Sequence, residues 1–139
     1  MAINIDDLRS WIGREEVAED IITPFPVAGL AATLDRDDPK PRPDDTLPPL
    51  WHWLYFLPIA RQSELESDGH LKRGGFLPPV PLPRRMWAGA RIEFRRPLRI
   101  GEAIVRKSTI ADVSTKDSRV VPLIFVSVRQ RSLGPQGSL

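Results

Sequence analysis

The sequence predicts an α+β fold, with helices in the first part of the chain and a long antiparallel meander in the last third. Apolar residues follow helix-start signals near the N-terminus at helical spacing. Three apolar segments separated by turns follow residue 86. Proline clusters lie between these parts and exclude helix interiors there. In such a fold, one face of the sheet has to be covered by a helix or by another subunit.

The composition is that of a globular protein. Of the 139 residues, 41% are hydrophobic and 27% charged, and one domain is expected over residues 1–131, with a flexible tail at 132–139. The net charge of +2 comes from scattered basic residues, so no nucleic-acid partner is expected. Cysteine is absent, and the sequence shows neither a signal peptide nor an apolar run long enough to span a membrane. We therefore expect a cytoplasmic protein with no membrane partner.

Two helices are predicted in the N-terminal part of the chain. Asn4 is placed to cap a helix over residues 5–12, which Gly13 ends. Thr23 and Pro24 form an N-cap and first-turn pair that opens a second helix. The stretch "EEVAEDIIT" between the helices is compatible with a strand or a helix. The second helix is expected to bury one side, made of Val27, Leu30, Ala31 and Leu34.

The rest of the chain is expected to hold a loop and three strands. Residues 35–45 are charged and rich in proline, which predicts a solvated surface loop. Strands are expected at residues 87–94, 103–113 and 120–131, and the first of them alternates apolar and polar residues. The middle of the third is apolar on both faces, as in a central strand covered on both sides. Pro122 cannot donate to a ladder, so it should lie near that strand's start or at a bulge.

Three stretches together carry a resemblance to a known family: "LPPLWHW", "DGHLKRGGFLPPVPLPRRMWAG" and "EFRRPLRIGE". They resemble the N-terminal half of the MaoC-like double hot-dog acyl-CoA hydratases and dehydratases. The resemblance implies a hot-dog fold, in which an antiparallel sheet wraps a central helix. It also implies that two hot-dog units, fused or separate, form one active site that adds water reversibly to the double bond of a CoA thioester.

The family's catalytic pair is an Asp and a His in a motif of the form Asp-x-Asn-Pro-x-His, where the two side chains share one water. The nearest match here is "DTLPPLWH", from Asp45 to His52. Its Asp–His separation is two residues too long, and Leu47 and Pro48 stand where Asn-Pro is expected. The resemblance therefore implies a non-catalytic, substrate-shaping half, with His52 as the candidate for a catalytic role.

The stretch "GGFLPPVPLP" takes the place where the resemblance implies the central helix. Proline inside a helix costs about 3 kcal/mol, so this stretch is expected to be extended or turning. We expect the missing helix to leave a groove on the concave face of the sheet that admits an acyl group. The residues expected to line it are Trp51, Trp53, Phe76, Leu77, Met86 and Trp87.

Each candidate residue also has a simpler explanation. Tryptophan is usually buried, so the "WHW" stretch fits a core as well as an acyl-chain contact. Gly74-Gly75 fits a flexible turn, or free amides that bind an oxyanion. No metal-ligand spacing or phosphate-binding loop is present, so no metal or cofactor is expected. The basic candidates fit solvated positions or contacts to CoA phosphates: His70, Lys72, Arg73, Arg84 and Arg85.

Two classes of function are compatible with these residues. The first is a substrate-shaping hot-dog subunit of an enoyl-CoA hydratase or 3-hydroxyacyl-CoA dehydratase, paired with a second, catalytic hot-dog subunit. The second is a homodimer that binds acyl-CoA or lipid without catalysis. A hot-dog thioesterase is a further alternative, although no well-placed carboxylate in the predicted helical region supports it.

Overall fold

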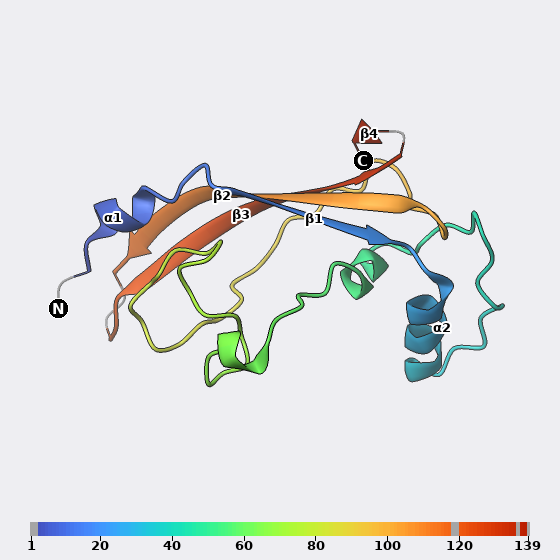
Figure 1. Ribbon diagram of the computed structural model, residues 1–139, viewed down its shortest axis with the longest axis horizontal. Helices are drawn as coiled ribbons and strands as arrows, with labels where there is room; N and C mark the ends of the chain where they lie inside the picture. The colour runs from blue at the N-terminus through green and yellow to red at the C-terminus, as the bar shows by residue number, and fades with distance from the viewer. Residues whose placement is uncertain (1–2, 118–119, 136, 139) are drawn as a thin grey trace. The chain divides into compact units, whose positions relative to one another are not determined.

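A computed structural model of the chain describes residues 3–117, 120–135 and 137–138 (Figure 1). The chain forms two compact units. Unit 1 comprises Met1–Glu16, Ile59–Ala90 and Lys107–Gln130, and unit 2 comprises Val17–Pro58, Arg91–Arg106 and Arg131–Leu139. The single domain over residues 1–131 stays a prediction. Among the described residues, no helix is long and apolar enough to cross a membrane.

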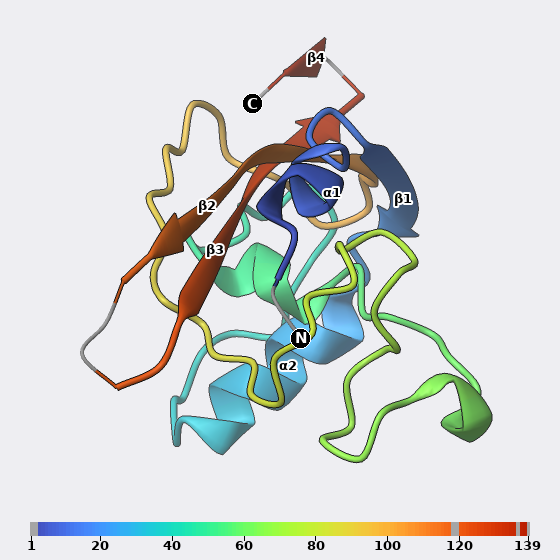
Figure 2. The ribbon, with the colours of Figure 1, turned by 90° about the vertical axis from the view of Figure 1, so that its left-hand side faces the viewer.

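An antiparallel sheet and a small helical part make up the fold, as the α+β prediction requires. The strands are ordered β1-β2-β3-β4, and the arrows of β2 and β3 run in opposite directions (Figure 2). Backbone bonds from Ile110 to Arg14 and from Ile22 to Glu102 give β1 and β2 their antiparallel register. The elements are α1 Ile5–Arg9, β1 Glu15–Ile21, α2 Pro24–Thr33, η1 Trp51–Leu54, η2 Gln62–Glu64, β2 Ala103–Lys116, β3 Leu123–Gly134 and β4 Gly137–Ser138.

Local signals set the starts of both α-helices. The Asn4 side chain accepts the N–H of Asp6 at 3.1 Å, which confirms the cap of α1. This helix is shorter than predicted, because it ends at Arg9 and the chain then turns through Gly13 at a φ of 90°. The ambiguous stretch after it forms the strand β1.

Helix α2 begins at Pro24 after Thr23, as predicted. Ala31 is buried, and Val27 and Leu30 are partly buried, so most of the predicted apolar side is confirmed. The prediction was wrong for Leu34, which is 54% exposed. The reason is that the helix ends at Thr33 and Leu34 is its C-cap, one residue beyond the packed turns.

The predicted strand at residues 87–94 is absent, because the segment makes no ladder. Its apolar residues lie open to solvent, with Trp87 at 76% and Phe94 at 50% exposure. Alternating apolar and polar residues show that a segment is compatible with a sheet. They do not provide a neighbouring strand for it to pair with. The backbone that follows pairs elsewhere: Leu47 donates to the carbonyl of Leu98 at 2.7 Å, so the chain leaves the segment toward another partner.

The other two predicted strands form, with different bounds. Strand β2 continues to Lys116, three residues beyond the prediction, and part of the predicted turn, at 118–119, lies outside the described residues. Strand β3 begins at Leu123, three residues later than predicted, with Pro122 directly before it. It continues to Gly134, where β4 pairs with it, although residues 132–139 were expected to form a tail.

The doubly covered central strand was predicted at the wrong place. No residue of Leu123–Gly134 is buried, whereas β2 carries Ile104, Ile110 and Val113 at 1% exposure or less. The physical reason is packing, because Ile104 lies in the buried cluster of unit 2, and Ile110 and Val113 lie in that of unit 1. The side chains of β3 that pack on the second of these clusters, such as Val126, are only partly buried.

Each unit has its own hydrophobic core. In unit 1, Leu8, Ile110 and Val113 are buried, and apolar residues of β3 and of the proline-rich stretch pack on them. In unit 2, the buried cluster joins the end of β1, the residues after η1 and the turn before β2. Its members are Ile22, Leu47, Tyr55, Phe56, Leu98, Ile100 and Ile104.

Candidate functional site

The "WHW" stretch forms the 3-10 helix η1 in unit 2. Trp51 is half-buried, packs on the core of unit 2 and lies under the guanidinium of Arg36, whose carbon is 5.6 Å from the ring centroid. Trp53 is 54% exposed. The core explanation therefore holds for Trp51, while Trp53 is available for contact with a ligand or partner.

His52 lies half-buried among aromatic rings. Its ring centroid is 6.0 Å from that of Trp53 and 5.9 Å from that of Phe94, which it meets edge-on. Burial lowers the pKa of His52, because the cationic form loses hydration. The imidazole is therefore neutral at pH 7 and can accept or donate a hydrogen bond.

The backbone is strained on both sides of η1. Leu50 has a φ of 73° and Phe56 a φ of 58°. Large side chains rarely adopt this left-handed region, so the surroundings must hold these residues there.

Contacts to β1 and to the start of α2 hold the residues that follow η1. The Tyr55 hydroxyl donates to the carbonyl of Thr23 at 2.5 Å, and the N–H of Phe56 donates to Asp20 Oδ2 at 2.8 Å. The guanidinium carbon of Arg106 lies 5.1 Å from the centroid of the Phe56 ring. Burial and the charge of Asp20 raise the pKa of Tyr55 to about 12, so this phenol stays protonated and keeps its bond to Thr23.

Sequence reasoning missed this cluster, although it left signals. Asp20 alternates in β1 with Ala18 and precedes the buried Ile22, which places a carboxylate on the core side of a strand. Tyr55 is the only tyrosine of the chain and directly follows "WHWL". The partners themselves are far away in the sequence, so neither signal identifies them.

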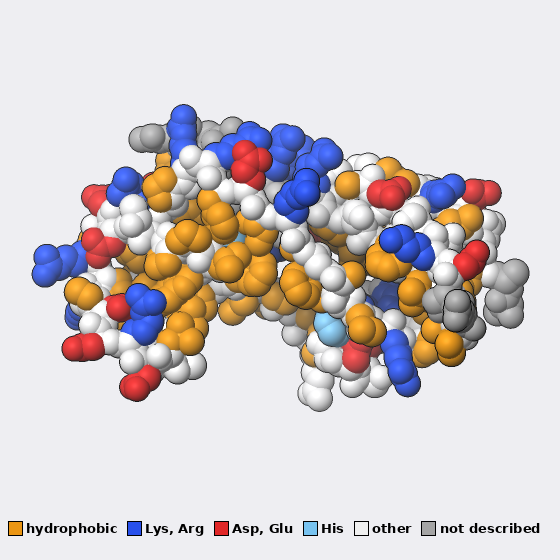
Figure 3. All heavy atoms as spheres, turned by 180° about the vertical axis from the view of Figure 1, so that it is seen from behind, with side chains coloured by type: hydrophobic (Ala, Val, Ile, Leu, Met, Phe, Trp, Pro, Cys, Tyr) orange, Lys and Arg blue, Asp and Glu red, His pale blue; other side chains and the backbone are white. Residues whose placement is uncertain are grey.

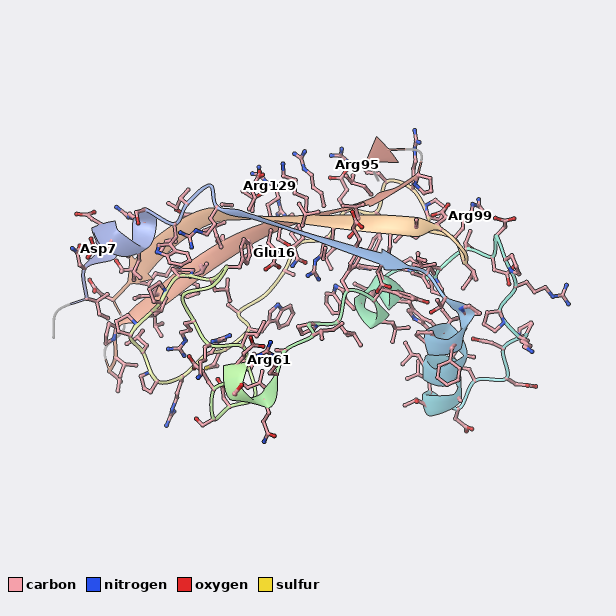
Figure 4. The ribbon with its side chains drawn as sticks, viewed as in Figure 1. Asp7, Glu16, Arg61, Arg95, Arg99 and Arg129 are labelled. Atoms are coloured by element: carbon pink, nitrogen blue, oxygen red, sulfur yellow. The ribbon has the colours of Figure 1, made fainter. Side chains whose placement is uncertain are left out.

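Asp45 and His52 are held by different neighbours. Asp45 Oδ2 accepts the N–H of Arg42 at 2.8 Å in an exposed turn, while the His52 ring meets Trp53 and Phe94. The turn itself is anchored by Arg99, labelled in Figure 4, which donates to the carbonyl of Asp44 at 2.9 Å. The carboxylate of Asp45 thus serves the loop, and a catalytic role for His52 stays a prediction.

The proline-rich stretch in unit 1 is not helical, as predicted. Phe76, Leu77 and Val80 pack on the core of unit 1, and Pro78 is fully buried. Arg73 Nη1 donates to the carbonyl of Val80 at 2.7 Å and also to that of Leu82. Prolines lack N–H groups, so these carbonyls take a side-chain donor in place of a backbone one.

The six residues predicted to line one groove are divided between the units. Trp51 and Trp53 belong to unit 2, and the other four belong to unit 1. Phe76 and Leu77 pack on the core, whereas Met86 is 85% exposed and Trp87 is 76% exposed. The common groove stays a prediction.

The residues predicted to contact CoA phosphates all lie in unit 1. They differ in whether the side chain bonds to the backbone. Lys72 and Arg84 are exposed. Arg73 and Arg85 donate to backbone carbonyls, the latter to Leu71 at 3.3 Å. His70 is exposed, with Nδ1 3.3 Å from the carboxylate of Asp68. Lys72 and Arg84 are therefore the candidates whose side chains point to solvent.

The double glycine is a turn rather than a pair of free amides. Gly74 has a φ of 92°, and its N–H donates to the carbonyl of Leu77 at 3.0 Å. The carbonyl of Gly75 accepts Arg14 Nη1 at 3.1 Å. The oxyanion alternative was therefore wrong for Gly74, because its amide is used inside the loop. In the part of the chain that the structure describes, no group of three or more His, Cys, Asp or Glu could hold a metal ion.

Comparisons with known proteins give two findings. The family described as hydroxyacyl-thioester dehydratase type 2 matches residues 50–136. Mesaconyl-C(4)-CoA hydratase of Chloroflexus aurantiacus is 53% identical over 122 residues, which make up 88% of this chain and 44% of that relative. The chain thus spans less than half the length of the curated relative that it matches.

Proposed function

Because the chain belongs to the hydroxyacyl-thioester dehydratase type 2 family, we propose that it is the substrate-shaping half of an acyl-CoA hydratase or dehydratase. In this proposal a second hot-dog unit, fused or separate, carries the acid and the base. The family resemblance seen in the sequence is confirmed. The antiparallel sheet with its small helical part is the hot-dog fold that the resemblance implied.

The observation that carries the proposal is the combination of high identity and short coverage. A chain that is 53% identical to a hydratase but spans 44% of it corresponds to one of two parts. The state of the motif supports the non-catalytic part, since Asp45 caps a loop turn and His52 packs on aromatic rings.

The chemistry divides between this chain and the second hot-dog unit as follows. Reversible hydration requires one group that takes a proton from water and one that manages the proton at the α-carbon. The second hot-dog unit supplies both of these groups. This chain contributes apolar and aromatic contacts to the acyl part of a CoA thioester, with Trp53 and Trp87 as exposed candidates. The exposed Lys72 and Arg84 contribute charge for the CoA phosphates.

The test is a hydration assay with short-chain enoyl-CoA thioesters. Loss of the conjugated double bond is the signal that measures the reaction. The chain alone is expected to show no hydration. Activity is expected when a hot-dog protein with an intact Asp-x-Asn-Pro-x-His motif is added. Robust hydration by the chain alone that survives His52→Ala would contradict the division of labour, and release of free thiol would indicate a thioesterase.

A binding homodimer is a second candidate, favoured by the apolar side chains that lie open to solvent in Figure 3. Phe25 and Met86 are both 85% exposed, so they are the side chains that such a homodimer would have available. Calorimetric titration with acyl-CoA and sizing of the chain alone separate the two candidates. Tight acyl-CoA binding by a homodimer that no catalytic unit activates would favour this second function.

A further inference from the structure

The strained backbone around η1 raises the question of what holds it. Among the residues that the structure describes, four non-glycine residues have positive φ: Asp35, Asp44, Leu50 and Phe56. Aspartate tolerates this region because its short side chain can bond locally, whereas leucine and phenylalanine adopt it rarely. The two large residues lie directly before η1 and two residues after it, so the strain is concentrated around His52.

Asp20 uses both carboxylate oxygens at this place. Oδ1 accepts the N–H of Ile21 at 2.7 Å within β1, and Oδ2 accepts the N–H of Phe56 at 2.8 Å, 36 residues along the chain. The second bond ties the strained residue to a strand. A carboxylate acceptor makes such a bond shorter and stronger than a neutral oxygen does.

A short series of contacts leads from Asp20 to His52. Phe56 is 7% exposed, with the guanidinium of Arg106 over its ring, and Tyr55 beside it is 4% exposed. The N–H of Tyr55 then donates to the carbonyl of His52 at 3.1 Å. All of these residues belong to unit 2, and each contact fixes the backbone that carries the imidazole.

We propose that Asp20 is a positioning residue for His52. By holding the N–H of Phe56, it keeps the chain in the strained turn that sets the His52 ring edge-on against Phe94 and leaves Trp53 exposed. The positioning of His52 does not depend on the proposed function. Only one consequence rests on that function: the same turn presents Trp53 to the acyl part of the substrate.

A simpler role for Asp20 makes a different prediction. If the carboxylate only completed the end of β1 through Ile21, its removal would change the stability of the strand and leave the His52 ring in place. Ring currents report the difference, because the His52 protons lie near two aromatic rings. His70 is the one other histidine in the sequence and lies exposed in unit 1, so it serves as an internal reference.

The experiment compares the imidazole proton resonances of the full chain with those of Asp20→Ala, Asp20→Asn and the exposed control Glu19→Ala. Asp20→Ala is expected to move the His52 resonances to exposed-imidazole values and leave those of His70 unchanged. Asp20→Asn keeps a neutral oxygen, so a partial loss of the His52 shift and faster exchange of the Phe56 amide are expected. Glu19→Ala is expected to match the unchanged chain.

Unchanged His52 resonances and unchanged exchange of the Phe56 amide in Asp20→Asn would overturn the proposal, even if Asp20→Ala does not fold. Calorimetric titration with crotonyl-CoA in the presence of the catalytic unit then tests the consequence, with several-fold weaker binding expected for Asp20→Ala. A lost His52 shift with unchanged affinity would leave the positioning role intact and remove the acyl contact from the proposed function.

Discussion

Two titratable side chains three residues apart show how burial acts on single residues. Burial lowers the pKa of His52 and raises that of Tyr55, because it disfavours the charged form in both cases. Both groups are therefore neutral at pH 7, and both link the stability of unit 2 to pH, in opposite directions.

His52 is expected to weaken the fold in acid. In the unfolded chain it gains a proton near pH 6.5, while the folded chain resists protonation until a lower pH. Its stabilising effect is thus complete above pH 6.5 and is lost as the pH falls toward the lowered pKa. Urea unfolding at pH 7.5 and 5.5 measures this loss, which should be smaller in His52→Gln. The exposed control His70→Gln should lose as much as the unchanged chain, and an equal loss in both variants would contradict the prediction.

Tyr55 is expected to weaken the fold in alkali. The unfolded phenol ionises near pH 10 and the folded one near 12, so its contribution is complete below pH 10 and is lost as the pH rises to 12. Tyr55→Phe also removes the bond to Thr23 and should lower the unfolding free energy at pH 7 by about 1–2 kcal/mol. Its stability should then change less than that of the unchanged chain between pH 9.5 and 11. A steeper decline in the variant would show that this phenol is not the group that titrates.

At the scale of elements, the proline-rich stretch shows how a segment without regular structure becomes ordered. Its prolines remove amide donors, its apolar side chains pack on the core of unit 1, and Arg73 binds two of its carbonyls. Arg14, which donates to Gly75 and stacks on Trp11 with 3.5 Å between the guanidinium carbon and the ring centroid, anchors the start of the stretch. Side chains here replace the bonds that a helix would form within itself.

Arg73→Ala is expected to lower the unfolding free energy in urea by about 1.5–3 kcal/mol, because two carbonyls lose a charged donor. Arg73→Lys should recover part of this loss, since an ammonium group lacks the planar fork of a guanidinium. The exposed Arg84→Ala is the matched control, and its effect should lie within about 0.5 kcal/mol. Equal effects of Arg73→Ala and Arg84→Ala would show that the contacts of Arg73 contribute nothing to stability.

At the scale of the whole molecule, two separate cores coexist with many exposed apolar side chains. Phe25 in unit 2 and Met86 in unit 1 are examples, each 85% exposed. Because these side chains are exposed, they can be tested directly for contact with another subunit.

Under the proposed function, Phe25→Glu and Met86→Glu are expected to weaken association with a second hot-dog unit, or with a second copy, at least tenfold. The unfolding free energy of the chain alone should stay within about 0.5 kcal/mol of its original value, because neither side chain is buried. Analytical ultracentrifugation over a concentration series measures association, and Lys40→Glu in the exposed loop is the control. Unchanged association in both variants would place the interface elsewhere on the chain.

The sequence by itself determined the features that depend on neighbouring residues. Asn4 and Thr23-Pro24 set where the α-helices begin, Pro122 stays outside the ladder just before β3, and the prolines after Gly75 excluded a helix. The tertiary structure alone decided which side chains meet. The bond from Asp20 to Phe56 joins residues 36 positions apart, and the bond from Tyr55 to Thr23 joins residues 32 apart. Likewise, residues 87–94 alternate like a strand yet make no ladder. Caps and prolines act within one turn of the backbone, whereas a hydrogen bond between distant residues depends on where the rest of the chain places its partner.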